Sequence, residues 1–361
     1  MINISENGQI QRAKDECTET LALSFQGIRF RLHTNNRAVL DNLECYFAGL
    51  TMPASAPIEQ TIYLLDQEPD IDQTRWTPVK RNKVSPLGLK EAYADAPDGR
   101  WIHKVRTGMV MFQSLTEPMV IGHLLENPSQ VVNFINNQFL NHYQRQGYVL
   151  GHASAFNING NTTAIAASSG GGKSTLMLKA LETELAQFLS NDRVLFQHDG
   201  KQTNILGVAK HPRVNPGTLL HSDRLAPILP AEERTRFASL PGKELWGIEQ
   251  KYDVLIPQHY GDNKVALTGT LNNLVLLDWS LDTSATTELT PVNIHETPHA
   301  LEGLRKSPGP FFQTSEGQFP PEQSQPLSVY TDNLKGVQVW RLSGKVDFDQ
   351  AIHQLQERGI L

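Results

Sequence analysis

The residues best suited to chemistry form a glycine-rich run near the middle of the chain. Ser168-Ser-Gly-Gly-Gly172 is followed directly by Lys173, Ser174 and Thr175. Glycines let the backbone close around a phosphate, so that successive N–H groups point inward. A lysine at this place can reach the outer phosphates, and the serine hydroxyl can ligate Mg²⁺. The run predicts a site for the phosphates of a nucleoside triphosphate. The candidate binding residues are Ser169, Gly170, Gly171, Gly172, Lys173, Ser174 and Thr175.

The segments on either side of this run support the same interpretation. Thr163–Ala167 is a short apolar run typical of a buried strand. A helical pattern is expected after the loop, with Leu176, Leu178, Leu181, Leu185 and Phe188 as its apolar positions. A helix N-terminus adds about half a positive charge where the phosphates would lie. Ala167 occupies the place of the usual first glycine of the motif. A flexible glycine turn before Lys-Ser is the alternative, and the flanking strand and helix make it the weaker one.

A carboxylate is expected beside the phosphate site. Asp192 follows Lys173 by 19 residues and stands before the apolar run Val194-Leu-Phe196. A helix of about 12–14 residues and a short return connection fit this interval. Asp192 would then hold Mg²⁺ or accept a proton from a nucleophile. Its alternative role is that of a turn former.

A single histidine precedes the loop. His152 lies 21 residues before Lys173, between Tyr148–Leu150 and Ala153–Ile158, which we expect to be a strand pair. A lone histidine is more often structural than catalytic, so the residues alone leave its role open.

The N-terminal part is expected to be a small α+β domain over residues 1–116. Leu21–Phe25 and Ile28–Leu32 alternate apolar and polar residues and predict a β-hairpin, and Trp101–Val105 with Met109–Phe112 predicts a second. Between the hairpins, Asn35 or Asn36 can cap a helix with a buried apolar face, and Thr61–Leu65 predicts a strand.

The second predicted domain covers residues 117–361. It is entered through a helix that begins at Asn127-Pro128 and carries Val131, Ile135, Phe139 and Tyr143 on one face. Residues 306–327 are dense in Pro, Gly, Ser and Gln, which is typical of a lid or a disordered loop, and disorder is favoured. A final helix after Asp347 carries Phe348, Ile352 and Leu355.

Composition excludes several classes of protein. The 361 residues include 32 Lys and Arg against 38 Asp and Glu, an acidic balance that argues against a dedicated nucleic-acid binder. Cys17 and Cys45 are too few for a disulfide framework or a cysteine zinc site. No apolar run approaches the roughly 20 residues that span a bilayer, and the N-terminus lacks a secretory signal. The expected location is cytoplasmic, with no membrane partner.

The combination of His152, the Lys173 loop and Asn191-Asp192-Arg193-Val194 resembles the catalytic domain of HPr kinase/phosphorylase. That domain belongs to the P-loop group that also contains ATP-dependent phosphoenolpyruvate carboxykinase. The resemblance is best over residues 148–198, while the N-terminal part resembles the HPr kinase-related proteins of the B branch. It implies an α/β P-loop kinase fold, with a mixed sheet and flanking helices. It also implies the cofactors ATP and Mg²⁺, and a homo-oligomer is conceivable because classical members are hexamers.

Carried over residue by residue, the resemblance places His152 in the active site, near the transferred phosphate. It assigns phosphate binding to Gly170, Gly172, Lys173 and Ser174. Asp192 matches the second acid of the family's Asp-Asp pair, as a general base and metal partner.

Two departures from the family pattern matter. Asn191 stands in place of the first acid, and Thr175 stands where the family has Glu. The resulting metal set is Ser174, Asp192 and Asn191, since an amide oxygen can still coordinate the metal. Lys251 and Arg213 remain open between phosphate or substrate contacts and solvated surface charges.

Three functions are consistent with these residues. The first is a kinase in which Lys173 and the loop amides neutralise phosphate charge and Asp192 orients a hydroxyl. By analogy with the family, its acceptor is Ser or Thr of a small protein, and a small-molecule hydroxyl is the alternative. The second is a nucleotide-binding regulatory protein without transfer activity, which the two missing carboxylates motivate. The third is a simple NTPase or switch.

Overall fold

The computed structural model describes most of the chain, namely residues 8–71, 75–79, 88–248, 250–321 and 324–361. It divides into two compact units. Unit 1 is Met1–Gln146 together with Pro308–Gln323, and unit 2 is Gly147–Ser307 together with Ser324–Leu361. No helix within the described ranges combines the length and the apolar character needed to cross a bilayer.

Unit 1 is built around one mixed sheet in the order β3-β1-β2-β4-β9-β8-β7-β6-β5. Strand β4 is parallel to both β2 and β9, and the other neighbours are antiparallel. Its described elements are α1 (Gly8–Asp15), β1 (Glu19–Phe25), β2 (Ile28–Thr34), α2 (Arg37–Tyr46), β3 (Thr51–Met52), β4 (Gln60–Asp66), β5 (Thr77–Pro78), β6 (Ala92–Ala96), β7 (Gly99–Lys104), β8 (Met109–Gln113), β9 (Met119–Gly122) and α3 (Pro128–Arg145).

The local patterns predicted for unit 1 are confirmed. Strands β1 and β2 form the first hairpin, with Phe25 opposite Ile28, and β7 and β8 form the second. Asn36 caps α2 by accepting a hydrogen bond from the Ala38 N–H, and α3 begins at the expected proline. These features depend on neighbouring residues, which is why short-range patterns predict them.

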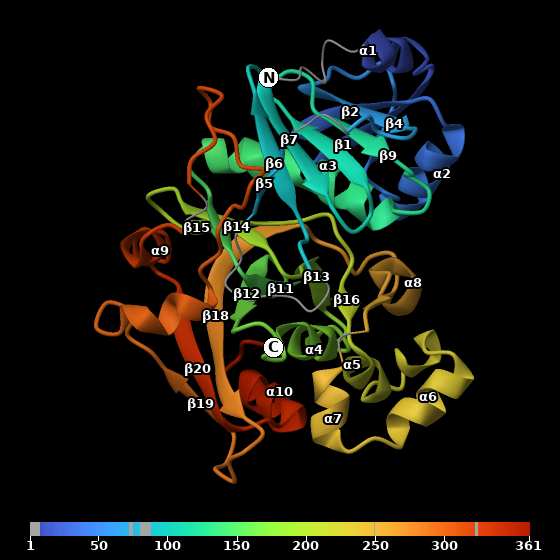
Figure 1. Ribbon diagram of the computed structural model, residues 1–361. Helices are drawn as coiled ribbons and strands as arrows, with labels where there is room; N and C mark the ends of the chain where they lie inside the picture. The colour runs from blue at the N-terminus through green and yellow to red at the C-terminus, as the bar shows by residue number, and fades with distance from the viewer. Residues whose placement is uncertain (1–7, 72–74, 80–87, 249, 322–323) are drawn as a thin grey trace. The chain divides into compact units, whose positions relative to one another are not determined.

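Unit 2 also contains a mixed sheet, in the order β10-β14-β15-β18-β12-β11-β13, with β20 beside β18 and β19 beside β20 (Figure 1). Its described elements are β10 (Val149–Gly151), β11 (Ala153–Ile158), β12 (Asn161–Ala166), α4 (Lys173–Ala180), β13 (Ala186–Ser190), β14 (Val194–His198), β15 (Thr203–Gly207), β16 (Arg213–Val214), α5 (Pro216–Leu220), the 3₁₀ helix η2 (Ala226–Ile228), α6 (Ala231–Ala238), α7 (Gly242–Gly247), β17 (Tyr252–Asp253), α8 (Ile256–Tyr260), β18 (Thr268–Ser280), β19 (Glu288–Pro291), the 3₁₀ helix η3 (Pro298–Gly303), α9 (Leu327–Asn333), β20 (Gln338–Lys345) and α10 (Phe348–Glu357). A mixed α/β architecture is therefore confirmed, whereas the kinase-type fold remains a prediction.

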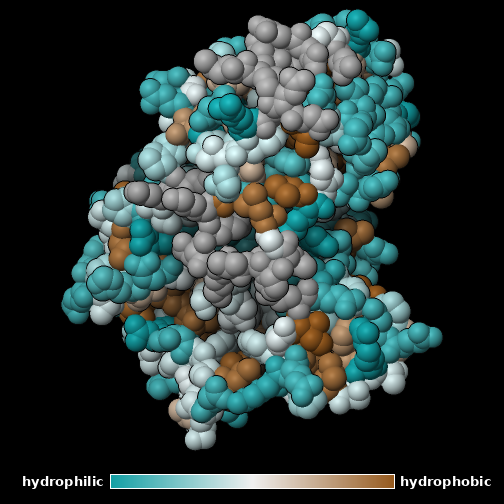
Figure 2. Space-filling view, in the orientation of Figure 1, coloured by the Kyte–Doolittle hydropathy of each residue, from teal (hydrophilic) through white to brown (hydrophobic). Residues whose placement is uncertain are grey.

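Alternating side chains of the central strands divide unit 2 into two hydrophobic cores. Ile165 of β12 packs in a core with helices α4, α5 and α10, while its neighbours Ala164 and Ala166 pack in a core with η3 and α9. Strand β18 alternates likewise, with Val275 on the α4 side. Successive side chains of a strand point to opposite faces, so one short apolar run supplies both cores. Outside the cores, Figure 2 shows small brown patches separated by hydrophilic residues, as is ordinary for a protein surface.

One edge of the unit 2 sheet gathers several chain segments that are distant in sequence. Strands β12, β18 and β20 are parallel, and β11 runs antiparallel to both β12 and β13. The carboxyl ends of β12, β13, β18 and β20 therefore meet the amino end of β11 at the same edge. The segments at this edge are the glycine loop, Asn191-Asp192, Trp279, Val346–Phe348 and His152. Ligands of α/β sheets commonly bind outside the carboxyl ends of the strands.

Two predicted elements of unit 2 are wrong in detail. Helix α4 has eight residues and ends at Ala180, so Leu185 lies beyond it and Phe188 lies in strand β13. The apolar run of β13 is short, and periodicity alone does not separate such a strand from a helix. The strands around His152 do not pair with one another, because β10 pairs with β14 and β11 pairs with β12 and β13.

The segment expected to be a lid or disordered instead packs, over most of its described part, within unit 1. The Asn141 side chain of α3 donates to the Phe311 carbonyl (2.8 Å) and accepts from the Gln313 N–H (3.0 Å). Phe311 also packs edge-on against Phe134. Residues 322–323 lie outside the described residues. These contacts join residues about 170 positions apart, so no local pattern reveals them.

The division into units differs from the predicted domains 1–116 and 117–361. The first unit continues through β9 and α3 to Gln146. Strand β9 pairs with both β4 and β8, which keeps this segment in the unit 1 sheet. The predicted domain boundary follows the last hairpin that the sequence pattern reveals, whereas β9 pairs antiparallel with β8 and parallel with the more distant strand β4.

Tyr330 of α9 provides a test of the packing in unit 2. Its fully buried hydroxyl donates to the Leu150 carbonyl (2.8 Å) and accepts from the Lys306 N–H (3.1 Å). Tyr330→Phe leaves both groups without this partner, at a cost of about 1–3 kcal/mol. We expect urea unfolding monitored by circular dichroism to show this loss. An unchanged midpoint would contradict the assigned hydrogen bonds.

Candidate functional site

The glycine loop connects β12 to α4 with two residues in the left-handed backbone region. Gly170 has φ +81° and Gly172, the N-cap of α4, has φ +92°. Such angles are strained for residues with a Cβ atom, so glycine is required here for conformational reasons. The Gly171 N–H donates to the Ser168 carbonyl (3.2 Å), which closes the turn. The expected order of strand, glycine loop and helix is thus present over residues 161–180.

Two aromatic residues support the loop from the neighbouring strand and helix. The indole Nε1 of Trp279, at the end of β18, donates to the Gly171 carbonyl (2.9 Å). Its ring packs edge-on against Phe348 of α10, with ring centroids 4.9 Å apart. A Cβ atom on Gly172 would lie 3.1–3.2 Å from both rings. Sequence reasoning missed this support, since Phe348 was assigned only to an apolar helix face.

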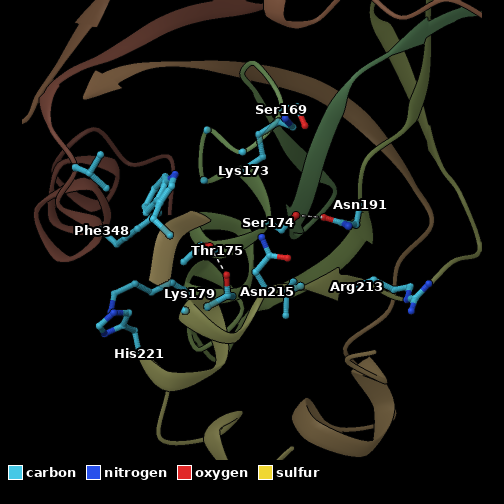
Figure 3. A pocket seen from close by; sticks show the side chains of 18 of the residues that line it. Ser169, Lys173, Ser174, Thr175, Lys179, Asn191, Arg213, Asn215, His221 and Phe348 are labelled. Atoms are coloured by element: carbon cyan, nitrogen blue, oxygen red, sulfur yellow. Dashed lines mark hydrogen bonds between the residues drawn. The ribbon is translucent and has the colours of Figure 1, made fainter. Parts of the chain in front are cut away.

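Lys173 is the first residue of α4, and its side chain is folded back over the loop (Figure 3). The residue is 7% exposed, and its Nζ donates to the Ala167 and Ser168 carbonyls, each at 3.0 Å. Burial lowers the pKa of the Lys173 ammonium to about 8, and the charge of Asp192 acts in the opposite direction. The ammonium is therefore held at the loop by neutral oxygens, a costly arrangement that an anion would relieve.

Asn191 and Ser174 meet in the place where a metal is expected. The Asn191 Oδ1 accepts hydrogen bonds from the Ser174 hydroxyl (2.7 Å) and from the Ser154 hydroxyl (2.8 Å); Figure 3 marks the first. The amide oxygen thus occupies the position of an acid partner to the loop serine. Both oxygens are suitable ligands for Mg²⁺, although the amide contributes no charge.

Asp192 lies in the turn after β13 with a left-handed backbone, φ +68°. Its carboxylate has several partners, all at 3.4 Å or more: His152 Nε2 and Lys306 Nζ at 3.4 Å, and Arg193 Nε at 3.6 Å. Burial alone would raise the pKa of Asp192, but the His152 contact and the charges of Lys306 and Arg193 outweigh it and hold the pKa well below its usual range.. The side chain remains 48% exposed, so it can still accept a hydrogen bond from a bound molecule.

His152 is held between the strands and Asp192. Its backbone N–H donates to the Leu304 carbonyl (2.7 Å), and its side chain is 18% exposed. Burial lowers the pKa of His152, against the opposing effect of its contact with Asp192. The imidazole is therefore expected to be neutral at pH 7 and to orient the carboxylate rather than add charge.

These residues line one cavity of about 750 Å³ in unit 2, a volume usual for small-molecule sites. It brings together all of the predicted site residues: Ser169, Gly170, Gly171, Gly172, Lys173, Ser174, Thr175, His152, Asn191 and Asp192. Their roles remain predictions. The Thr175 hydroxyl bonds to that of Thr218 on α5 (2.7 Å). Arg213 and Lys251 also line the cavity, and Arg213 pairs with Asp253 at 3.0 Å.

Sequence reasoning missed other residues that line the cavity. Lys210 follows β15, and the apolar residues Leu245 and Trp246 come from α7. The run Lys210-His-Pro-Arg213 carried the only signal, as a basic stretch near the site. Tertiary packing decides which of its side chains face the cavity.

The donor set fits a magnesium-bound triphosphate better than a metal held by protein alone. Across the described part of the chain, no cluster of three or more His, Cys, Asp or Glu side chains is suited to hold a metal. Ser174, Asn191 and Asp192 instead offer a few oxygens beside a buried lysine. Mg²⁺ in phosphate-transferring sites is held in this manner, by one or two protein groups and the phosphates.

Comparisons with known proteins give limited information. No family model matches the sequence, and no curated protein matches it either. Among solved structures, the HPr(Ser) kinase/phosphatase from Coxiella burnetii aligns with 58% of this chain and 93% of its own. The sequence identity is 11% and the TM-score is 0.27. A likeness at this level carries no conclusion about family or activity.

The loop glycines allow a graded test. Gly170→Ala places its Cβ in open space, whereas Gly172→Ala must also displace the rings of Phe348 and Trp279. Each substitution costs about 1–2 kcal/mol in backbone strain. We expect Gly172→Ala to weaken ATP binding by a further factor of about ten relative to Gly170→Ala, as measured by calorimetric titration. Equal losses would contradict a supporting role for the aromatic pair.

Proposed function

We propose that this protein is an ATP-dependent phosphotransferase that moves the γ-phosphate of ATP to a hydroxyl group. The observation that carries the proposal is the Lys173 ammonium, buried at the N-terminus of α4 with two carbonyl oxygens as its partners. A buried cation that donates only to neutral oxygens is unfavourable unless an anion binds there. The loop amides and the helix N-terminus favour the same kind of ligand.

The residues of the loop would bind the phosphates. Lys173 and the backbone N–H groups neutralise negative charge, and Ser174 with Asn191 would hold Mg²⁺. ATP supplies the transferable phosphoryl group, and Mg²⁺ offsets the charge on its phosphates. Trp279 and Phe348 keep the loop in one conformation, so that its amides need not reorganise.

Asp192 would orient the acceptor hydroxyl by accepting its hydrogen bond. Because its pKa is held well below the usual range, the carboxylate is a weak base early in the reaction. This suits a loose transition state, in which little proton transfer is needed before the phosphoryl group moves. A bond forms between the acceptor oxygen and the γ-phosphorus, the bond to the β–γ bridging oxygen breaks, and the hydroxyl proton leaves through Asp192 to solvent.

The acceptor is open between two classes. The resemblance described above favours Ser or Thr of a small protein, and a small-molecule hydroxyl is the alternative.

A second candidate function, nucleotide-dependent regulation without transfer, is favoured by Asn191. An amide beside Ser174 supplies no negative charge, which weakens metal binding relative to a carboxylate. Incubation with labelled ATP and cell extract distinguishes the two, because regulation predicts bound nucleotide and no labelled product.

The roles of Lys173 and Asp192 are separable by substitution. We expect Lys173→Ala to abolish ATP binding in calorimetry. Asp192→Asn should leave the Kd for ATP largely unchanged and lower transfer by a factor of about 100 or more. Asp223→Asn, an exposed change elsewhere in unit 2, is the matched control. Retained transfer in a folded Asp192→Asn protein would rule out the role of Asp192.

The carboxylate that Asn191 replaces, by comparison with the resembled family, can be restored by substitution. Asn191→Asp keeps an acceptor oxygen for Ser174 and Ser154 and adds a negative charge at the metal position. We expect the Mg²⁺ concentration for half-maximal ATP binding to fall, since affinity rises with ligand charge. A Mg²⁺ requirement that is unchanged or higher in Asn191→Asp would show that this residue does not face the metal.

A further inference from the structure

Cationic side chains outnumber carboxylates on the wall of the cavity. Besides Lys173, its wall includes Lys210, Arg213 and Lys251, and Arg193 and Lys306 lie beside Asp192. The carboxylates that pair with this group are Asp192 and Asp253. Asp347 and Asp349 also line the wall, and Asp349 pairs with Lys179 at 2.7 Å. The chain as a whole has a net charge of −6, so the excess is local.

Lys210 stands out within this group. Arg213 pairs with Asp253, and Arg193 and Lys306 contact Asp192. The Lys210 ammonium makes no hydrogen bond or ion pair with any part of the chain that the structure describes. Burial lowers its pKa to about 8, and the charge of Arg193 adds to this effect. A half-buried ammonium next to another cation is unfavourable in the free protein and becomes favourable when an anion binds.

Lys210 lies near Asp192, where the acceptor hydroxyl is proposed to bind, rather than at the glycine loop. The Val208 N–H donates to the Ser190 hydroxyl (3.0 Å), which fixes the chain just before Lys210 beside the Asp192 turn. Arg193 and Asp192 are the charges that act most strongly on Lys210. Lys251 acts instead on Lys173 and lines the same cavity.

We propose that Lys210 forms an anion subsite for the phosphoacceptor next to Asp192. The acceptor is then a small hydroxyl compound that carries its own carboxylate or phosphate. This inference rests on the proposed phosphotransferase function and names its substrate class. A cavity of about 750 Å³ suits a small molecule beside the nucleotide. In the transfer, ATP donates the phosphoryl group to the hydroxyl, and the acceptor's own anion remains unchanged on Lys210.

The test uses the full chain saturated with Mg²⁺ and the β,γ-methylene analogue of ATP, so that the loop is filled. Inorganic phosphate is then titrated in by calorimetry as the probe. We expect one phosphate to bind the wild-type protein and its affinity to fall at least about tenfold in Lys210→Gln. Lys210→Met repeats the test while keeping the aliphatic stem. Lys201→Gln removes an exposed lysine as the matched control and should leave phosphate binding unchanged.

A second measurement identifies the class of acceptor. ADP release is followed with glycerol, glycerate and glycerol 3-phosphate, and with a serine peptide flanked by glutamates. Stimulation by glycerate or glycerol 3-phosphate but not by glycerol, lost in Lys210→Gln, supports the proposal. Stimulation by the peptide alone would overturn the small-molecule class.

The outcomes separate this inference from the function on which it rests. Phosphate that fails to bind the loaded protein, or binds Lys210→Gln as tightly as wild type, overturns the anion subsite while ATP binding stays intact. Failure of the wild-type protein to bind the ATP analogue would instead overturn the proposed function, and the subsite with it.

Discussion

The site depends on the burial of a lysine ammonium whose hydrogen-bond partners are neutral carbonyl oxygens. Lys173 is held at the start of α4 by two backbone carbonyls, and burial depresses its pKa. A protein gains nothing in stability from this arrangement, because the charge loses its hydration and finds only neutral partners. Binding of a polyanion, as proposed, would offset this cost. The glycine conformations, the indole hydrogen bond to the loop and the position of α4 can all be understood as conditions for keeping that lysine in place.

Strand order explains how distant residues meet around this lysine. The parallel run of β12, β18 and β20, with β11 antiparallel, brings the loop, Trp279, Phe348 and His152 to one edge. The turn after β13 adds Asn191 and Asp192. Asn191 accepts from two hydroxyls, whereas the Asp192 carboxylate lies 3.4 Å from the Lys306 ammonium and 3.6 Å from the Arg193 guanidinium. The two adjacent residues therefore offer different groups to the cavity: Asn191 a neutral amide oxygen and Asp192 an ionised carboxylate.

Part of the fold and of the site is predictable from the sequence, because it depends on interactions between residues that are close in the chain. The hairpins of unit 1, the Asn36 and Asp347 caps and the strand–loop–helix around Lys173 depend on residues within a few positions of one another. The sequence also indicated every residue of the loop, with His152, Asn191 and Asp192. It did not reveal the aromatic support of Gly172, the cavity position of Lys210 or the packing of Phe311 in unit 1. Those depend on contacts between segments far apart in the chain, where periodicity carries no information.

The most direct test of the proposed role of Lys173 is a crystal structure of the protein with Mg²⁺ and the β,γ-methylene analogue of ATP. We expect the Lys173 ammonium to leave the Ala167 and Ser168 carbonyls and to contact the outer phosphates, with the loop backbone unchanged. A nucleotide bound elsewhere, or bound in this cavity while Lys173 still donates to those carbonyls, would contradict that role.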